Sequence, residues 1–354
     1  MPQAPLETRQ HQDPGAHYLL VVASVVVVIA GLKAAASVIL PFFIAVFIAM
    51  ISFPLLNWLQ SKRVPNALAL LATLFAVISV LVAFGLLVAG SISSFTAQVP
   101  KYQTQLEQMF SGVLGWLETR GLDITEQITT LDLLNPARAL NLVTGSLRAL
   151  TAVLSNLLLV FLTIVFLLLE AAGFPVKFQK AFGTAAGGDR LVRIKTEVQR
   201  YLAIKTSFSL ATGGLVALAL TIIGVDFPLL WGTLAFLTNY IPSLGSIIAA
   251  VPPTLLAIVQ FGSGRAIAVA AVFLVINVTL GNFLEPHLMG RRLGLSTLVV
   301  FLSLVFWGWI WGPVGMFLSV PLTMIIKIAL ENTKDFRWVA VLLDAGPKQE
   351  APAR

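Results

Sequence analysis

The chain has 354 residues and is too apolar to be covered by an ordinary water-facing surface. Hydrophobic residues make up 58% of it and charged residues 11%, whereas soluble domains contain about 45–50% and about 25%. We therefore expect an integral membrane protein whose solvent is the lipid bilayer. The 23 basic and 16 acidic residues give a net charge of +7, an excess that fits cationic cytoplasmic loops, so nucleic-acid binding is not expected. Because there is no cysteine, disulfides, thiolate metal sites and thiol nucleophiles are excluded.

The first 90 residues are interpreted as a polar tail followed by three membrane spans. Residues 1–17 carry prolines and both charge signs, which is typical of a disordered tail, here assigned to the cytoplasm. The apolar run of residues 18–53 is too long for one ~30 Å hydrocarbon core at ~1.5 Å per residue. We therefore predict two short spans that turn near Lys33, and a third span over residues 66–90.

A cleaved signal peptide is the rival interpretation of the first span. Ala34, Ala35 and Ala36 offer the small residues of a cleavage site. The segment before the apolar run, however, carries Glu7 and Asp13, whereas the leading region of a signal peptide is basic. We therefore expect the first span to remain part of the protein.

Residues 91–147 are predicted to be an external, amphipathic helical region. Apolar side chains recur there at steps of three and four residues, at Val99, Tyr102, Leu106, Met109, Val113 and Leu117. Such spacing predicts a helix with one apolar face, which can lie on the membrane surface or against neighbouring subunits. Membrane lipid and further copies of the chain, in a homo-oligomer, are the expected partners.

Residues 148–340 are expected to form the main membrane core, followed by a cytoplasmic tail over residues 341–354. A fourth span ends at Glu170, and the segment 171–203 after it concentrates basic residues, which assigns it to the cytoplasm. The rest of the core is predicted as a fifth span near residues 204–224, a sixth near 266–284, and two short spans that break at Gly312-Pro313 and end near Leu330.

A re-entrant helical hairpin is predicted over residues 226–262. Its two apolar halves are each short for a membrane crossing and flank the sequence from Asn239 to Gly245, which contains Pro242. Non-helical backbone at membrane depth is tolerated only where protein or water satisfies it, and interrupted helices mark binding sites in transporters. The predicted fold class is an all-α integral membrane protein with about eight transmembrane helices, this hairpin and amphipathic surface helices. Both termini and the basic loops are then cytoplasmic.

The turn inside this hairpin supplies candidate contacts for a permeating solute. Asn239, Tyr240 and Ser243 bring an amide, a phenol and a hydroxyl, and Pro242 and Gly245 leave backbone groups exposed. These groups could hold a small polar solute by hydrogen bonds. The alternative is that proline and glycine only bend the chain while Asn239 caps a helix end.

A second set of candidates follows the sixth span. Asn277, Gly281 and Glu285 recur every four residues, so on a continuous α-helix they form one stripe that could line a cavity. Asn282 and Pro286 lie beside this stripe. An ionisable group is costly in lipid and marks transport pathways, so Glu285 is a candidate carrier of a proton or cation.

Two candidate charges have competing interpretations, and a third position is a candidate hinge. Glu285 could instead lie at the water boundary and pair with Arg291 or Arg292, a contact worth about 0–1 kcal/mol. Asp226, which precedes the hairpin, could form an outer gate and couple ions, or be an ordinary charge at a helix end. Gly312-Pro313 is a candidate hinge because glycine and proline interrupt an apolar run there.

Several enzyme classes lack their motifs in this sequence. It contains no GxxxxGK[ST] loop, no HExxH motif and no Gly-x-Ser-x-Gly elbow, so ATP hydrolysis and zinc proteolysis are not expected and no cofactor or metal is implied. A membrane enzyme built on other groups is disfavoured because a serine such as Ser243 has no histidine within an apolar span to act as its base. A non-transporting envelope scaffold is the other alternative, since the 91–147 region could bind partner helices.

A series of short motifs extends across the membrane part of the chain: Pro41-Phe42, Pro54, Gly224 to Pro228, Asn239 to Gly245, Glu285-Pro286, Gly290 to Leu295, Trp311 to Met316 and Val320 to Leu322. Together they resemble the autoinducer-2 exporter family of bacterial inner-membrane transporters, over nearly all of residues 18–335. The resemblance implies a multispan permease without an ATPase. Some members export the quorum-sensing signal autoinducer-2 and others exchange sodium or lithium for protons, so the substrate would be a small molecule or a monovalent cation. The chain departs from the family pattern at Ser246 and Thr297, where proline is usual, and at Glu170, where aspartate often ends the span.

Overall fold

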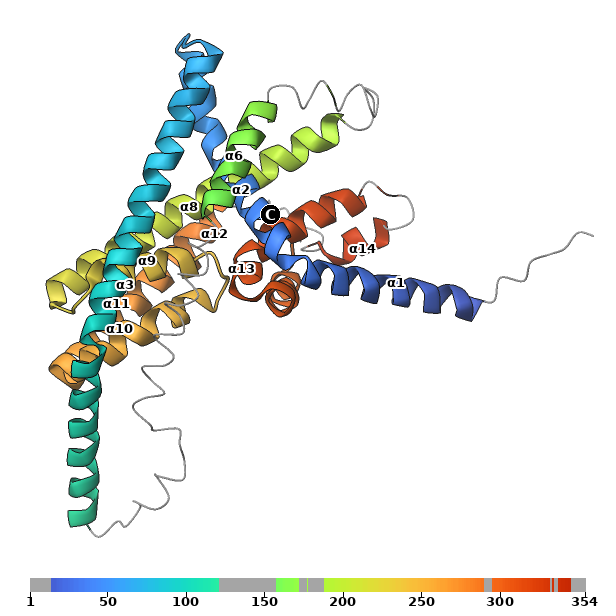
Figure 1. Ribbon diagram of the computed structural model, residues 1–354. Coiled ribbons are helices and arrows are strands. Elements are labelled where there is room, and N and C mark those ends of the chain that lie inside the picture. Colours follow the sequence, from blue (N-terminus) through green and yellow to red (C-terminus); the bar gives the residue numbers. More distant parts are fainter. Residues whose placement is uncertain are drawn as a thin grey trace, which may run out of the picture.

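The computed structural model describes residues 14–120, 157–171, 177, 188–289, 295–331, 333 and 337–344. The elements in these ranges are helices (Figure 1): α1 (Pro14–Ala34), α2 (Ala36–Ser61), α3 (Asn66–Thr119), α6 (Leu157–Ala171), α8 (Gly188–Ile223), α9 (Pro228–Thr238), α10 (Gly245–Phe261), α11 (Ser263–Ile276), the π-helix η2 (Asn277–Leu284), α12 (Glu285–Met289), α13 (Thr297–Glu331) and α14 (Arg337–Leu342). Most of the two predicted tails, the second half of the 91–147 region and much of the 171–203 loop lie outside the described residues.

Five helices in the described ranges are long and apolar enough to cross a membrane. They lie in α2, α3, α8, α11 with its continuation, and α13. Large apolar side chains on them are well exposed, for example Phe75 of α3 at 72% and Ile222 of α8 at 77%. Apolar surface of this extent is compatible with lipid and not with water. The chain is therefore an all-α, multi-pass membrane protein.

Helix α3 is continuous from Asn66 to Thr119, whereas the sequence predicted that the span would end at Gly90. Figure 1 shows the C-terminal part of α3 extending past the other described helices. Beyond Gly90 the helix is stabilised by Phe95 and Tyr102, which are each 1% exposed and pack in one apolar cluster with residues of α9 and α10. The apolar face at Tyr102 is thus covered by these two helices and not by the membrane surface.

Helices α8 and α9 approach closely because glycines meet where they cross. A Cβ on Gly213 would lie 2.6 Å from the carbonyl oxygen of Gly232, and a Cβ on Gly232 would lie 2.6 Å from that of Gly213. Small residues at such crossings let helix backbones pack against each other within membranes. The crossing holds α9 against the face of α8 that carries the polar side chains described below.

Helix α13 consists of two helices that fold against each other at Gly312, where φ is 63° and ψ is −147°. The Ser303 hydroxyl of the first half lies 2.6 Å from the Thr323 hydroxyl of the second. The indole N–H of Trp307 donates to the same Thr323 oxygen at 3.2 Å. The break predicted at Gly312-Pro313 is therefore present, while its action as a hinge stays a prediction.

Helix α1 extends away from the other helices in Figure 1, with its C-terminal end near α13. There the Trp311 indole N–H donates to the carbonyl oxygen of Leu32 at 2.9 Å, and the Lys33 ammonium lies 4.7 Å from the ring centre of Trp309. The chain turns at Ala35, close to the turn predicted near Lys33. Much of α1 exposes apolar side chains, as expected of a helix in contact with lipid.

Candidate functional site

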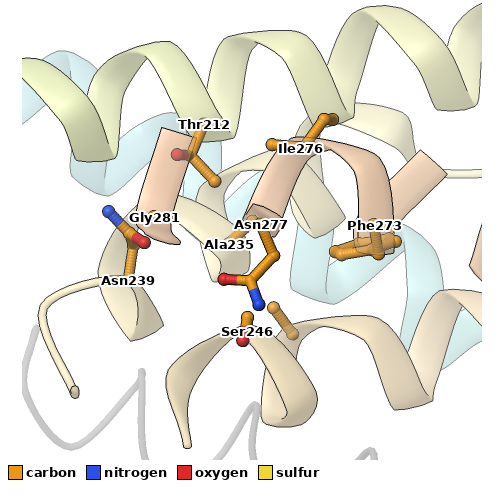
Figure 2. A pocket seen from close by; sticks show the side chains of 9 residues that line it. Thr212, Ala235, Asn239, Ser246, Phe273, Ile276, Asn277 and Gly281 are labelled. Atoms are coloured by element: carbon orange, nitrogen blue, oxygen red, sulfur yellow. The ribbon is translucent and has the colours of Figure 1, made fainter. Parts of the chain in front are cut away.

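A small cavity lies where α8, the turn after α9, α10 and the α11–η2 helix meet (Figure 2). It offers about 10 Å³ to the centre of a water molecule, which is about the room that one water requires. Its wall combines amide and hydroxyl groups with apolar side chains: Thr212, Asn239, Ser246, Asn277, Ala235, Ala249, Phe273 and Ile276, with Gly281.

Asn239 reaches the cavity because α9 ends at Thr238 and the chain turns sharply into α10 at Gly245. A Cβ on Gly245 would overlap the carbonyl oxygen of Thr238, so the turn requires glycine at this position. The Asn239 amide nitrogen donates to the Ser209 hydroxyl of α8 at 3.0 Å. Figure 2 shows the nitrogen turned away and the amide oxygen on the side of the cavity, so Asn239 presents an acceptor there.

The segment Asn277–Leu284 is a π-helix, so the continuous α-helix on which the predicted stripe depends is not present. Its wider turns follow an i→i+5 hydrogen-bond pattern, which is rare and occurs frequently at functional sites. Gly281 leaves room for the preceding amide, because a Cβ there would lie 3.0 Å from Asn277 Oδ1.

The π-helix separates the residues of the predicted stripe. Asn277 and Gly281 line the cavity, and Glu285 begins α12 beyond it. Asn282 and Pro286 are exposed. Of the second set of candidates, only Asn277 and Gly281 therefore line the cavity.

Glu285 forms an ion pair with Lys205 of α8, at 2.6 Å between Oε1 and Nζ. The two side chains are 12% and 8% exposed. The sequence suggested Arg291 or Arg292 as partners, and both lie outside the described residues. Lys205 was missed because it lies at the start of the fifth span and was counted with the basic residues of the preceding cytoplasmic loop. The signal that could have identified it is its helical spacing to Ser209 and Thr212, which gives α8 a polar face.

Tyr240 follows Asn239 in the turn after α9 and bonds α8 one residue from Lys205. Its hydroxyl donates to the Thr206 hydroxyl of α8 at 2.7 Å, and its ring centre lies 4.4 Å from that of Phe317 in α13. Two other candidates from the same turn are placed differently: Pro242 is half-buried and Ser243 is exposed, with a φ of 62°.

Asp226 belongs to a second polar cluster, just beyond the C-terminal end of α8. The Tyr102 hydroxyl of α3 lies 2.7 Å from Asp226 Oδ2 and 2.9 Å from Gln98 Oε1. The Gln260 side chain of α10 donates to the same hydroxyl at 3.3 Å and accepts from the Asp226 backbone N–H at 3.3 Å. Asp226, which was predicted as an outer gate, is thus hydrogen-bonded to α3 and to α10.

The chemistry of the cavity is that of neutral hydrogen bonding. Its polar side chains are two amides and two hydroxyls, and its apolar wall includes Phe273 and Ile276. In the part of the chain that the structure describes, no three His, Cys, Asp or Glu side chains gather to hold a metal ion. At its present size such a site can hold one water molecule or a single dehydrated monovalent cation by oxygen contacts.

The sequence is similar to known proteins over almost its entire length. The model of a family described as AI-2E family transporter matches residues 22–335. The AI-2 transport protein TqsA of Escherichia coli (strain K12) is 39% identical over 331 residues, which cover 93% of this chain and 96% of TqsA. The protein YhhT of the same strain is 38% identical over 352 residues, covering 98% of this chain and all of YhhT. A Haemophilus influenzae relative is 40% identical over 332 residues, covering 92% of this chain and 95% of the relative.

Proposed function

Because the chain belongs to the AI-2E family of membrane transporters, we propose that it is a secondary transporter, driven without ATP, that exports a small polar solute past the cavity between Asn239 and Asn277. The observation that carries this proposal is the cavity itself, in which amides from an interrupted hairpin and from a π-helix face one another. Interrupted helices of this kind supply binding groups at the membrane midplane in transporters. The solute, the coupling and the direction all belong to the proposal.

The proposed topology has eight crossings with α9 and α10 as a re-entrant hairpin. Helix α9 has 11 residues, which at ~1.5 Å per residue is well short of a ~30 Å hydrocarbon core. The chain would lie in a bacterial inner membrane with both termini in the cytoplasm, as its basic segments favour. Thiol labelling of single cysteines near each terminus, in sealed inverted vesicles, tests this orientation.

The cavity lies between two polar clusters, and this arrangement supports a pathway with a gate at each end. Tyr102, Asp226 and Gln260 form one cluster, just beyond the C-terminal end of α8, and Lys205, in the middle of α8, forms the other with Glu285. Because the cavity holds only about one water, it is too small for the solute, and the structure represents a closed state of the transporter. Solute passage then requires one cluster at a time to open.

Glu285 is the residue proposed to couple export to the proton gradient. A proton on its carboxylate would cancel its charge, and the ion pair with Lys205 would lose its attraction. In proteoliposomes with an imposed pH gradient, Glu285→Gln is expected to transport without responding to the gradient. Flux that follows the gradient as it does in the unaltered protein would remove this role from Glu285.

Sodium or lithium exchange for protons is the second candidate. It is favoured by one observation: the cavity has the size of a single water and is lined by side chains bearing oxygen acceptors. Counterflow separates the two candidates. Preloaded autoinducer-2 that accelerates its own uptake supports the first, and accelerated uptake of radioactive sodium by internal sodium or lithium supports the second.

A further inference from the structure

The Lys205–Glu285 ion pair is buried on both sides, unlike the exposed pairs on the same helix. Its side chains are 8% and 12% exposed, whereas those of the Arg193–Glu197 pair of α8 are 56% and 34% exposed. Removing two charges from water costs several kcal/mol per ion before their attraction is counted, so a buried pair is weak evidence for stability alone. Its presence beside a transport cavity points to function.

The pair joins the two walls of the cavity. Lys205 precedes Thr212 by two helical turns of α8, about 10 Å at 1.5 Å per residue. Glu285 directly follows η2, which carries Asn277 and Gly281. An ion pair between these helices therefore ties the α8 wall to the η2 wall at one end of the cavity.

The ion pair is not needed to hold α8 in place, because neutral contacts already do so. The Tyr240 hydroxyl already bonds α8 at Thr206, one residue from Lys205. The glycine crossing of α8 with α9 is apolar and close. Helix α8 is thus held by neutral contacts as well, and an ionic contact adds a connection whose strength depends on charge.

We propose that Lys205 and Glu285 form a charge lock that closes the cavity toward the cytoplasm, and that transport requires this lock to open. The proposal rests on the proposed function, because it assigns the cavity to the solute pathway. The two walls can separate only when the ion pair breaks. Lys205 is accordingly a gating residue that acts through Glu285, while the solute is held by the neutral groups of the cavity.

A cysteine reporter tests the lock, and the natural absence of cysteine makes the reporter specific. Ser246→Cys places one thiol in the cavity wall with little change in size. Its reaction rate with a membrane-impermeant maleimide is measured in inverted and in right-side-out vesicles. The lock is removed by Lys205→Met with Glu285→Gln and reversed by Lys205→Glu with Glu285→Lys. The control pair is Arg193→Met with Glu197→Gln, which removes exposed charges of α8 together with the Arg193–Glu331 contact to α13.

The expected result is that removal of the lock increases labelling in inverted vesicles about tenfold, because the open state is more populated. The reversed pair is expected to return labelling to the slow rate, and the control pair to leave it unchanged. Monodisperse elution in detergent establishes that each variant is folded, and the neutral pair is chosen because replacing both ions can leave stability unchanged.

Three outcomes would overturn the lock, and they differ in what they mean for the pathway. Equal labelling in all variants shows that the cavity is reachable, which keeps the pathway and rejects the lock. Protection of the thiol from both sides in every folded variant rejects the lock together with the pathway. Fast labelling of the reversed pair would also reject it, because an electrostatic lock is symmetric in charge.

Discussion

The side-chain amide of Gln199 donates a hydrogen bond to the carbonyl oxygen of Met50 at 3.0 Å, and this bond joins α8 to α2. Met50 precedes Pro54 by four residues, and proline has no N–H to give to that carbonyl. Within a membrane, a backbone group released by proline is satisfied by neighbouring helices. Gln199 therefore replaces the backbone bond that Pro54 removes.

This relationship predicts coupling between the two positions. Gln199→Ala is expected to destabilise the protein by about 1–3 kcal/mol, because it leaves a partly buried acceptor without a donor. In the Pro54→Ala background the same substitution is expected to cost much less, since the restored N–H can bond to Met50. Thermal unfolding of the four proteins of this cycle in detergent measures the coupling, and additive effects would contradict it.

The glycine crossing of α8 and α9 offers a comparison between adjacent residues. Gly213→Ala puts a methyl group 2.6 Å from the Gly232 carbonyl oxygen, and overpacking of this kind costs about 1–3 kcal/mol. Gly214→Ala meets no atom within 4 Å and is expected to be neutral or to stabilise the helix by up to ~1 kcal/mol. Thermal melts of the two variants should shift in opposite directions or by clearly different amounts. Equal shifts would mean that the helices do not cross at Gly213.

The Tyr102 hydroxyl has one proton for two acceptors, and we expect Asp226 to receive it. The Asp226 contact is the shorter of the two and its acceptor can be ionised, whereas the Gln98 amide oxygen is neutral. Tyr102→Phe keeps the ring and is expected to cost about 1 kcal/mol, because the exposure of Asp226 screens the bond. Asp226→Ala should lower the melting temperature more than Gln98→Ala. A larger effect at Gln98 would assign the proton to the amide.

Some features of the site could be predicted from residue types, and others depend on depth and register. The break at Gly312-Pro313 and the turn at Asn239 were predicted because glycine and proline restrict the backbone locally. The role of Lys205 was not predicted, because a charge near the end of an apolar run can lie either in water or inside the protein. Only its contact with Glu285 in the structure shows that it lies inside. The π-helix was missed because a change from four- to five-residue hydrogen bonding leaves no mark in the spacing of Asn277 and Glu285.

The binding role of the cavity amides is tested by removing them. Asn239→Ala and Asn277→Ala are each expected to weaken solute binding about tenfold, the effect of a lost hydrogen bond of ~1.4 kcal/mol. Ser207→Ala is the matched control, since its hydroxyl is exposed on α8 and bonds the Ala203 carbonyl of its own helix. Scintillation proximity binding with labelled solute reports the change. Unaltered binding in both asparagine variants would leave the turn with a purely architectural role.

Counterflow in proteoliposomes tests most directly whether this chain moves a solute past Asn239 and Asn277. The protein is reconstituted without ATP, loaded in turn with autoinducer-2, sodium or lithium, and compared with the Asn239→Ala/Asn277→Ala double variant and with Ser207→Ala. Our account predicts that one of these substrates drives counterflow, that the double variant loses it, and that Ser207→Ala keeps it. Counterflow that is absent for all three, or that survives in the double variant, would contradict the account, and complete absence would favour a scaffold.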